Sequence, residues 1–152
     1  YNFESVLEPW AASLAADVDM QRTPAVWQPA MEAYARAYYS ATLLKVLDKV
    51  HMPIFEAIHV RREAIRSEQD LAKFFVAAGV SAEKFSQVYN SFGMSSMVNQ
   101  AKARMRSYRT QGTPEVIVNG KYRDSTRMTN GFEGMLNVAD FLIAKERAAA
   151  EK

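Results

Sequence analysis

The sequence predicts an α/β protein in which an all-helical domain interrupts the α/β part. Strand-like patterns occur only near residues 18–23 and 116–124, whereas the long stretch 28–109 carries apolar residues at helical spacing alone. The second strand-like region is followed directly by one more apolar helical stripe. The predicted order of elements is therefore helix, strand, helical block, strand, strand and helix.

The composition is that of a folded globular protein. The chain has 152 residues, of which 49% are hydrophobic and 24% charged, so it can bury a substantial core. Its net charge of +2 is too small to indicate a nucleic-acid or membrane-surface ligand, and the basic residues of 102–109 do not share one helical face. The absence of cysteine excludes structural disulfides, cysteine-ligated metal and thiol chemistry within this chain.

Residues 1–27 begin with a predicted helix and continue with a predicted strand. Apolar residues recur at helical spacing from Phe3, although no preceding residue can cap the first turn. The segment from Val18 to Thr23 alternates apolar and polar residues, as expected of a short strand with one buried face. A helix followed by a strand is typical of the second half of a βαβ unit, so we expect the first strand of that unit to be missing from this chain.

Residues 28–109 predict a series of helices with recognisable ends. The run Ser67-Glu68-Gln69-Asp70 has the form of a capping box ahead of an apolar stripe. Gly79 is a helix stop signal, and Ser81 can cap the helix that follows. The last helix of this block is predicted to run from Ser95 or Ser96 to Tyr108.

Residues 110–152 predict a β-hairpin and a final helix. Asn119-Gly120 is a strong two-residue turn signal between the strand runs Val116–Val118 and Lys121–Asp124. Pro114 stands at the mouth of the first of these strands, although proline has no N–H to give to a sheet ladder. The strand thus begins at a residue that pairs poorly, which needs an explanation.

Five segments resemble corresponding parts of one protein family. The first is "YNFE" (1–4), which resembles the residues directly after the family's Cys-Pro-His-Cys motif. The runs "HMPIFEAIHV" (51–60) and "YNSFGM" (89–94) are similar to its inserted helices. The runs "GTPEVIVNGKY" (112–122) and "EGMLNVADFLIAKE" (133–146) are similar to its proline loop with hairpin and to its last helix. On these segments the chain resembles the DsbA-type periplasmic thiol–disulfide oxidoreductases, a thioredoxin fold with an inserted helical domain.

The resemblance implies a three-layer α/β/α arrangement of the thioredoxin type. Residues 1–27 would supply a helix and a strand of one half, and residues 110–152 the two strands, the helix and the cis-proline loop of the other half. Residues 28–109 would form the inserted helical domain. The N-terminal strand or strands of the fold are expected to be missing from this chain.

The resemblance also implies the activity of a parent protein. A redox-active Cys-x-x-Cys is expected immediately before Tyr1, so no catalytic residue lies in this chain, and the 152-residue segment alone is predicted to be inactive. The parent is expected to introduce disulfides into secreted proteins by dithiol–disulfide exchange, without a cofactor or metal. Its expected partners are unfolded secreted proteins bearing thiols and a membrane DsbB-like reoxidase, with no nucleic acid, and its expected compartment is the periplasm.

For substrate binding, the resemblance assigns Gly112, Thr113 and Pro114. In the thioredoxin fold the proline at this place is cis, and proline is the residue that best tolerates a cis bond before it. The resulting bend would leave the main-chain N–H and C=O of Thr113 free to pair with an extended substrate segment. The missing donor of Pro114 is then tolerable because the position is a binding edge. By analogy with the family, the residue before this proline tunes the redox poise.

Two charged residues are candidates for electrostatic tuning of the redox site. Residues 1–7 would form the helix whose N-terminus lowers the pKa of a reactive cysteine, and Glu4 lies one turn into that helix. Arg22 lies in the predicted strand 18–23, where the family often places a charge that pairs with a buried acid. Both residues also fit an ordinary surface position, and the i,i+4 pair Glu4 and Glu8 is usual for an exposed helix face.

Other readings remain open or are set aside. His51 and His59 have no nearby carboxylate in the sequence and do not predict a zinc site. One alternative function is a redox-inactive peptide-binding or chaperone-like module that keeps the fold. Another is a glutathione-dependent isomerase or transferase of the same fold, with a serine in the missing motif and glutathione at the Pro114 loop. The sequence upstream of Tyr1 would discriminate among them.

Overall fold

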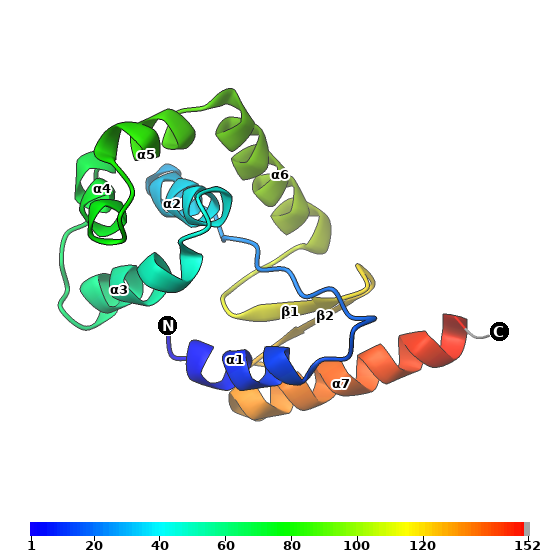
Figure 1. The fold of residues 1–152 in the computed structure, drawn as a ribbon. Coiled ribbons are helices and arrows are strands. Elements are labelled where there is room, and N and C mark those ends of the chain that lie inside the picture. Colours follow the sequence, from blue (N-terminus) through cyan, green and yellow to red (C-terminus); the bar gives the residue numbers. More distant parts are fainter. Residues whose placement is uncertain (151–152) are drawn as a thin grey trace. The chain divides into compact units, whose positions relative to one another are not determined.

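The computed structural model describes residues 1–150, so the last two residues of the predicted segment 110–152 lie outside the described part. The chain divides into two compact units (Figure 1). One unit contains Tyr1 and Thr23–Met105, and the other contains Asn2–Arg22 and the chain from Arg106 onward. Among the described residues, no helix combines the length and the apolar character that a membrane crossing needs.

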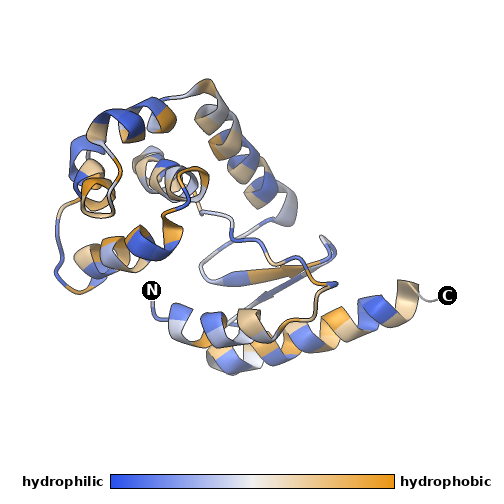
Figure 2. Cartoon of the chain, viewed as in Figure 1, coloured by the Kyte–Doolittle hydropathy of each residue, from blue (hydrophilic) through white to orange (hydrophobic). Residues whose placement is uncertain are grey.

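The first unit is helical and is built around its helix α2. Its elements are the 3-10 turn Pro29–Met31 and the helices α2 (Glu32–Leu43), α3 (Leu47–His59), α4 (Glu68–Ala77), α5 (Ala82–Tyr89) and α6 (Phe92–Tyr108). Ala37 and Ala41 of α2 belong to a buried cluster with residues of α3, α4 and α5, whereas Ala35 and Tyr39 belong to a second cluster with α6. Apolar and polar residues alternate along these helices, as Figure 2 shows by colour.

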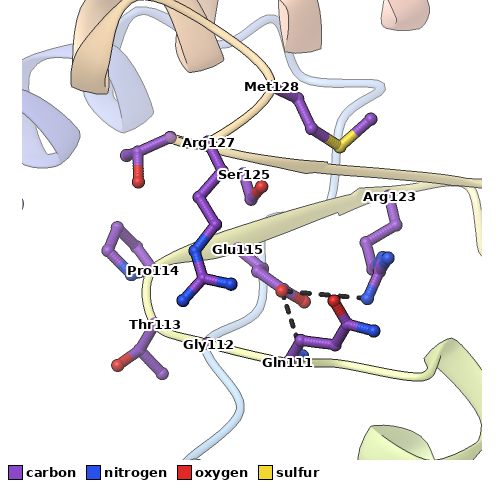
Figure 3. A pocket seen from close by; sticks show the side chains of 10 residues that line it. Gln111, Gly112, Thr113, Pro114, Glu115, Arg123, Ser125, Arg127 and Met128 are labelled. Carbon is purple, nitrogen blue, oxygen red and sulfur yellow. Dashed lines mark hydrogen bonds and ion pairs between the residues drawn. The ribbon is translucent and has the colours of Figure 1, made fainter.

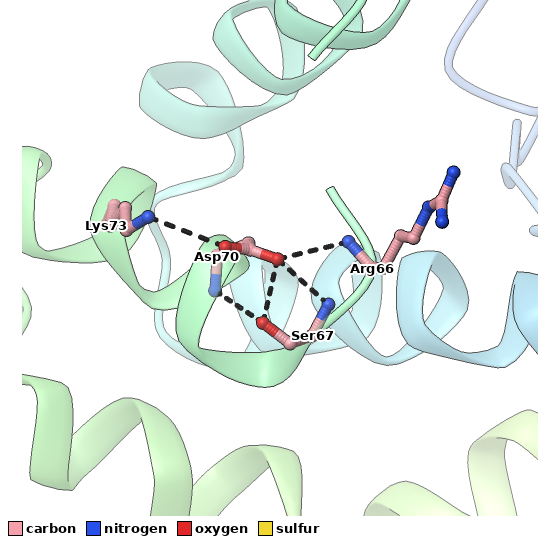
Figure 4. A network of polar contacts seen from close by, with 4 residues as sticks. All are labelled: Arg66, Ser67, Asp70 and Lys73. Carbon is pink, nitrogen blue, oxygen red and sulfur yellow. Dashed lines mark hydrogen bonds and ion pairs between the residues drawn. The ribbon is translucent and has the colours of Figure 1, made fainter. Parts of the chain in front are cut away.

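The ends of α4 and α5 confirm the predicted capping signals. Ser67 accepts a hydrogen bond from the Asp70 N–H at 3.1 Å, while the Asp70 carboxylate accepts from the Ser67 N–H at 3.2 Å, so the capping box is complete (Figure 4). Gly79 adopts a φ of 90°, which ends the helix before it. Ser81 accepts from the N–H of Lys84 and caps α5.

Helix α6 begins earlier than predicted. It starts at Phe92, where the hydroxyl of Ser91 accepts a hydrogen bond from the Met94 N–H at 3.1 Å. The predicted start at Ser95 or Ser96 was wrong because Gly93, a poor helix former, lies in the true first turn and conceals it. The side chain of Met94 is fully buried, which explains why the helix extends this far.

The second unit joins a hairpin to two helices. Its elements are α1 (Glu4–Ser13), β1 (Glu115–Val118), β2 (Tyr122–Ser125) and α7 (Gly131–Ala150). The strands pair antiparallel, with Glu115 opposite Ser125 and Val118 opposite Tyr122. Asn119 and Gly120 both have positive φ, 49° and 67°, as a type I′ turn requires, so the predicted hairpin is confirmed.

One face of the hairpin packs against α1 and α7. The core of this unit is formed by Phe3 and Leu7 of α1 with Met135 and Leu136 of α7, and Val116 packs against it. Because side chains alternate across a strand, Glu115 and Ile117 point to the opposite face of the hairpin from Val116. The indole N–H of Trp10 also donates to Asp140 at 2.8 Å and ties the two helices together.

The predicted strand from Val18 to Thr23 is wrong. The structure gives these residues no strand assignment, because a strand needs a hydrogen-bonded neighbour and only β1 and β2 pair with each other in residues 1–150. The predicted alternation is nevertheless present in the burial, since Asp19 and Gln21 are exposed while Met20 and Arg22 are partly buried. The pattern therefore predicted the sides of the segment correctly, but not its pairing.

Candidate functional site

The loop between α6 and β1 carries the three predicted substrate-binding residues. Gly112, Thr113 and Pro114 follow one another at the entry to β1, and the Thr113–Pro114 peptide bond is cis, as predicted. Thr113 is exposed, whereas Gly112 and Pro114 are partly covered. The proline therefore stands just before the ladder, where its missing N–H leaves no strand hydrogen bond unmade.

The main chain of this loop is open. Within residues 1–150, neither Gly112 nor Thr113 makes a main-chain hydrogen bond to another part of the chain. Exposed main-chain N–H and C=O groups next to a strand are the groups that an added extended peptide pairs with. The geometry at Thr113 is therefore compatible with peptide binding.

A pocket of about 260 Å³ lies beside the loop (Figure 3). Its wall consists of the loop itself and of the end of β2 with the residues that follow. The lining residues are Gln111–Glu115, Arg123 and Ser125–Met128. The pocket is small and mixed in character, because charged, hydroxyl and thioether side chains all contribute to it.

A buried carboxylate in this pocket holds the chain on both sides of it. The side chain of Glu115 is only 6% exposed, and its Oε1 accepts a hydrogen bond from the Gln111 N–H at 3.0 Å. The same oxygen lies 3.8 Å from Nη1 of Arg123, which in turn donates to the main-chain oxygen of Arg109. Glu115 Oε2 has no hydrogen-bond partner among the described residues.

The role of Glu115 was not predicted from the sequence. Its side chain was hidden in a strand-like run, "EVIV", in which a glutamate reads as an ordinary exposed residue. The available signal was its position directly after Pro114, on the opposite face of the strand from the buried Val116.

The two predicted tuning residues meet at the start of α1. Nη2 of Arg22 lies 3.0 Å from Oε2 of Glu4 and 2.5 Å from Oε1 of Glu8. The Glu4 and Arg22 side chains are 13% and 24% exposed, so neither is the freely solvated surface residue of the alternative interpretation. Burial opposes the charge of Arg22, but the charges and hydrogen bonds of Glu4 and Glu8 outweigh it and raise the pKa of the guanidinium. The contribution of Glu8 was missed, although its i,i+4 spacing from Glu4 was visible.

The two histidines take part in aromatic contacts. The rings of His51 and Phe55 lie 4.6 Å apart between centroids, and the ring of His59 stacks on Tyr1 at 5.6 Å. In the described part of the chain, no three His, Cys, Asp or Glu side chains come together as metal ligands would. Packing therefore accounts for both imidazoles.

Comparison with known sequences gives a consistent family assignment. Residues 4–142 match the model of the DSBA-like thioredoxin domain. The whole chain is 37% identical to the thiol:disulfide interchange protein DsbA of Pseudomonas aeruginosa and covers 72% of that protein. It is also 36% identical over 151 residues to DsbA of Pseudomonas syringae, of which it covers 71%.

Solved structures show the same similarity. The crystal structure of Pseudomonas aeruginosa DsbA matches with a TM-score of 0.95 at 37% identity, over 100% of this chain and 79% of that one. The DsbA of Proteus mirabilis, solved with a non-covalently bound peptide PWATCDS, matches with a TM-score of 0.78 at 25% identity, over 94% and 82% of the two chains.

Proposed function

Because this chain belongs to the family of DsbA-like thioredoxin domains, we propose that its Gly112–Pro114 loop binds an extended segment of a substrate polypeptide during thiol–disulfide exchange. The observation that supports this role is the open main chain of Gly112 and Thr113 beside a pocket. The Thr113 N–H and C=O would pair with the main chain of the substrate and hold its cysteine in place. The structure of a related DsbA with a bound peptide is consistent with this role.

The exchange itself needs a cysteine pair that this chain does not contain. We place that pair, as Cys-x-x-Cys, directly before Tyr1 in the complete gene product, at the N-terminus of α1. A substrate thiolate would attack its disulfide to form a mixed disulfide, and a second substrate thiolate would then release the reduced protein. The substrate loses two electrons and two protons and gains a disulfide, while the cysteine pair is reduced to two thiols. The 152-residue segment alone would be inactive.

The N-terminus of α1 favours the reactive thiolate. The helix dipole places partial positive charge there, which lowers the pKa of a cysteine and makes it a better leaving group. Glu4 and Arg22 lie one turn away and carry opposite charges. We assign to this pair the tuning of the local potential, in which Glu4 raises the thiol pKa and Arg22 partly cancels that effect.

The proposed setting follows from the same family membership. The complete protein would act in the periplasm on unfolded secreted proteins that carry thiols. A membrane protein of the DsbB type would accept the two electrons and restore the disulfide.

The proposal is tested on the complete gene product. The gene is sequenced upstream of the Tyr1 codon, and the encoded protein is mixed with a reduced, unfolded thiol protein while free thiols are counted. We expect a Cys-x-x-Cys before Tyr1 and stoichiometric oxidation of the substrate, and no catalysis of insulin reduction by dithiothreitol with the 152-residue chain. An upstream sequence without cysteines would refute the redox function and favour a peptide-binding module, and a serine in the motif would favour a glutathione-dependent enzyme.

A further inference from the structure

We propose that Glu115 is a positioning residue that holds the Gly112–Pro114 loop in the conformation in which its main chain stays open. The inference rests on the proposed function, since it is the peptide-binding role of this loop that makes its position matter. It names a residue that acts through the loop and does not itself pair with the substrate.

The first contact closes the loop onto the strand that follows it. Glu115 Oε1 accepts the Gln111 N–H at 3.0 Å, so a side chain at the start of β1 binds the main chain four residues earlier. Gly112, Thr113 and Pro114 lie between these two points. A hydrogen bond to a charged acceptor is stronger than one between neutral groups, so this contact restrains both ends of the three-residue segment.

The second contact ties the same carboxylate to β2. Arg123 lies on β2 opposite Ile117, and its Nη1 is 3.8 Å from Glu115 Oε1. The guanidinium also donates to the main-chain oxygen of Arg109, which precedes the loop (Figure 3 shows the Glu115 contacts). The ion pair therefore connects both strands of the hairpin to the chain that enters the loop.

The burial of Glu115 argues that the contact is kept for the loop. A carboxylate that is 6% exposed loses most of its hydration, and one of its oxygens finds no partner among residues 1–150. Such a group is costly, and an apolar side chain could replace it on a face that also carries Ile117. Stability alone therefore does not account for a glutamate here, whereas control of the neighbouring main chain does.

The opposite end of the hairpin offers a matched control. There Glu146 of α7 accepts hydrogen bonds from Lys121 and Asn119, each 2.5 Å long, and so holds the β-turn. This is also a carboxylate bound to a cation and to an amide on the same hairpin, but it makes no contact with the loop residues. Glu146→Gln should weaken the hairpin without moving the loop.

Amide hydrogen exchange tests the proposal directly in the 152-residue chain. In Glu115→Ala we expect the Gln111 amide to exchange about 10-fold faster or more, because its acceptor is gone. Glu115→Gln keeps an acceptor oxygen and should restore most of the protection, and Arg123→Met should give an intermediate rate. Glu146→Gln should lower the melting temperature with no change at Gln111. If Glu115→Ala leaves Gln111 exchange unchanged, or changes it only as much as Glu146→Gln does, Glu115 does not hold the loop.

Peptide affinity separates this inference from the proposed function. The probe is the heptapeptide PWATCDS, titrated by NMR into the unsubstituted chain and each variant. We expect Glu115→Ala to weaken binding about 10-fold, Glu115→Gln to weaken it much less, and Glu146→Gln to leave it unchanged. Equal affinity of Glu115→Ala and the unsubstituted chain overturns the positioning role. Absence of binding to the unsubstituted chain counts instead against the loop as a peptide site, and the exchange rates then decide on Glu115.

Discussion

Arg22 and Glu4 lie 3.0 Å apart between Nη2 and Oε2, although eighteen positions separate them in the sequence. The same guanidinium reaches Glu8, so one cation serves two carboxylates of α1. The two carboxylates differ in exposure, 13% for Glu4 and 65% for Glu8, which makes the cluster suitable for paired substitutions.

We predict that Glu4→Gln destabilises the chain more than Glu8→Gln does. Removing Glu4 leaves the partly buried Arg22 with one exposed partner, at an expected cost of about 1–2 kcal/mol in the free energy of unfolding. Removing the exposed Glu8 should cost about 0–1 kcal/mol. Urea unfolding of both variants measures the difference, and equal midpoints would contradict the assignment of Glu4 as the main partner.

A second prediction concerns the complete gene product with its proposed cysteine pair. Glu4→Gln removes a negative charge near the N-terminus of α1 and leaves Arg22 less compensated, so the reactive thiolate is favoured. We expect the pKa of that thiol to fall by about 0.5–1 unit, measured from the ultraviolet absorbance of the thiolate against pH. Glu8→Gln is the control and should shift it less. An unchanged or higher pKa in Glu4→Gln would exclude the proposed tuning role.

A third prediction follows from the capping box of α4. The hydrogen bond from the Ser67 hydroxyl, followed by that from the Arg66 N–H, lowers the pKa of Asp70 from 3.8 to about 2. Because the folded pKa is depressed, this contribution to stability is present above about pH 4 and is lost as the pH falls towards 2. Asp70→Asn should therefore destabilise the chain at pH 7, and the difference from the unsubstituted chain should shrink at pH 2.5. Urea unfolding at both values provides the measurement, and a difference that does not depend on pH would be incompatible with this origin.

A fourth prediction concerns the core of the helical unit. The rings of Phe75 and Phe85 lie 4.2 Å apart between centroids, and both side chains are fully buried. Phe75→Ala should lower the free energy of unfolding by about 3–5 kcal/mol, because it removes the ring and leaves a cavity. The neighbouring Val76 is half-exposed, and Val76→Ala should cost less than about 1 kcal/mol. Comparable losses in the two variants would show that this cluster does not stabilise the unit.

The features that the sequence predicted correctly are local ones. The Asn119-Gly120 turn, the Ser67–Asp70 capping box and the bent Thr113–Pro114 linkage each depend on residues that are adjacent or a few positions apart. Their backbone conformations are restricted by the residue types themselves, through positive φ, a side-chain acceptor or a proline ring. The short pattern was therefore sufficient in each case.

The features that escaped prediction depend on distant partners. The strand expected at Val18–Thr23 required a neighbouring strand, which sequence alternation alone cannot supply. Arg22 could not be assigned to Glu4 and Glu8 until the chain had folded back along α1. Glu115 likewise became informative only when the hairpin brought Arg123 beside it.

Helix α2 owes its central place to small side chains. Ala35, Ala37 and Ala41 are almost completely buried, and they divide between two separate clusters. Layers of surrounding helices can approach closely because methyl groups alone separate them from the central backbone. Any enlargement at these three positions would have to be absorbed by displacement of an entire neighbouring helix. Mutational tolerance should therefore be lowest where the side chains are smallest, and a saturation library of α2 would display it as three intolerant positions among permissive ones.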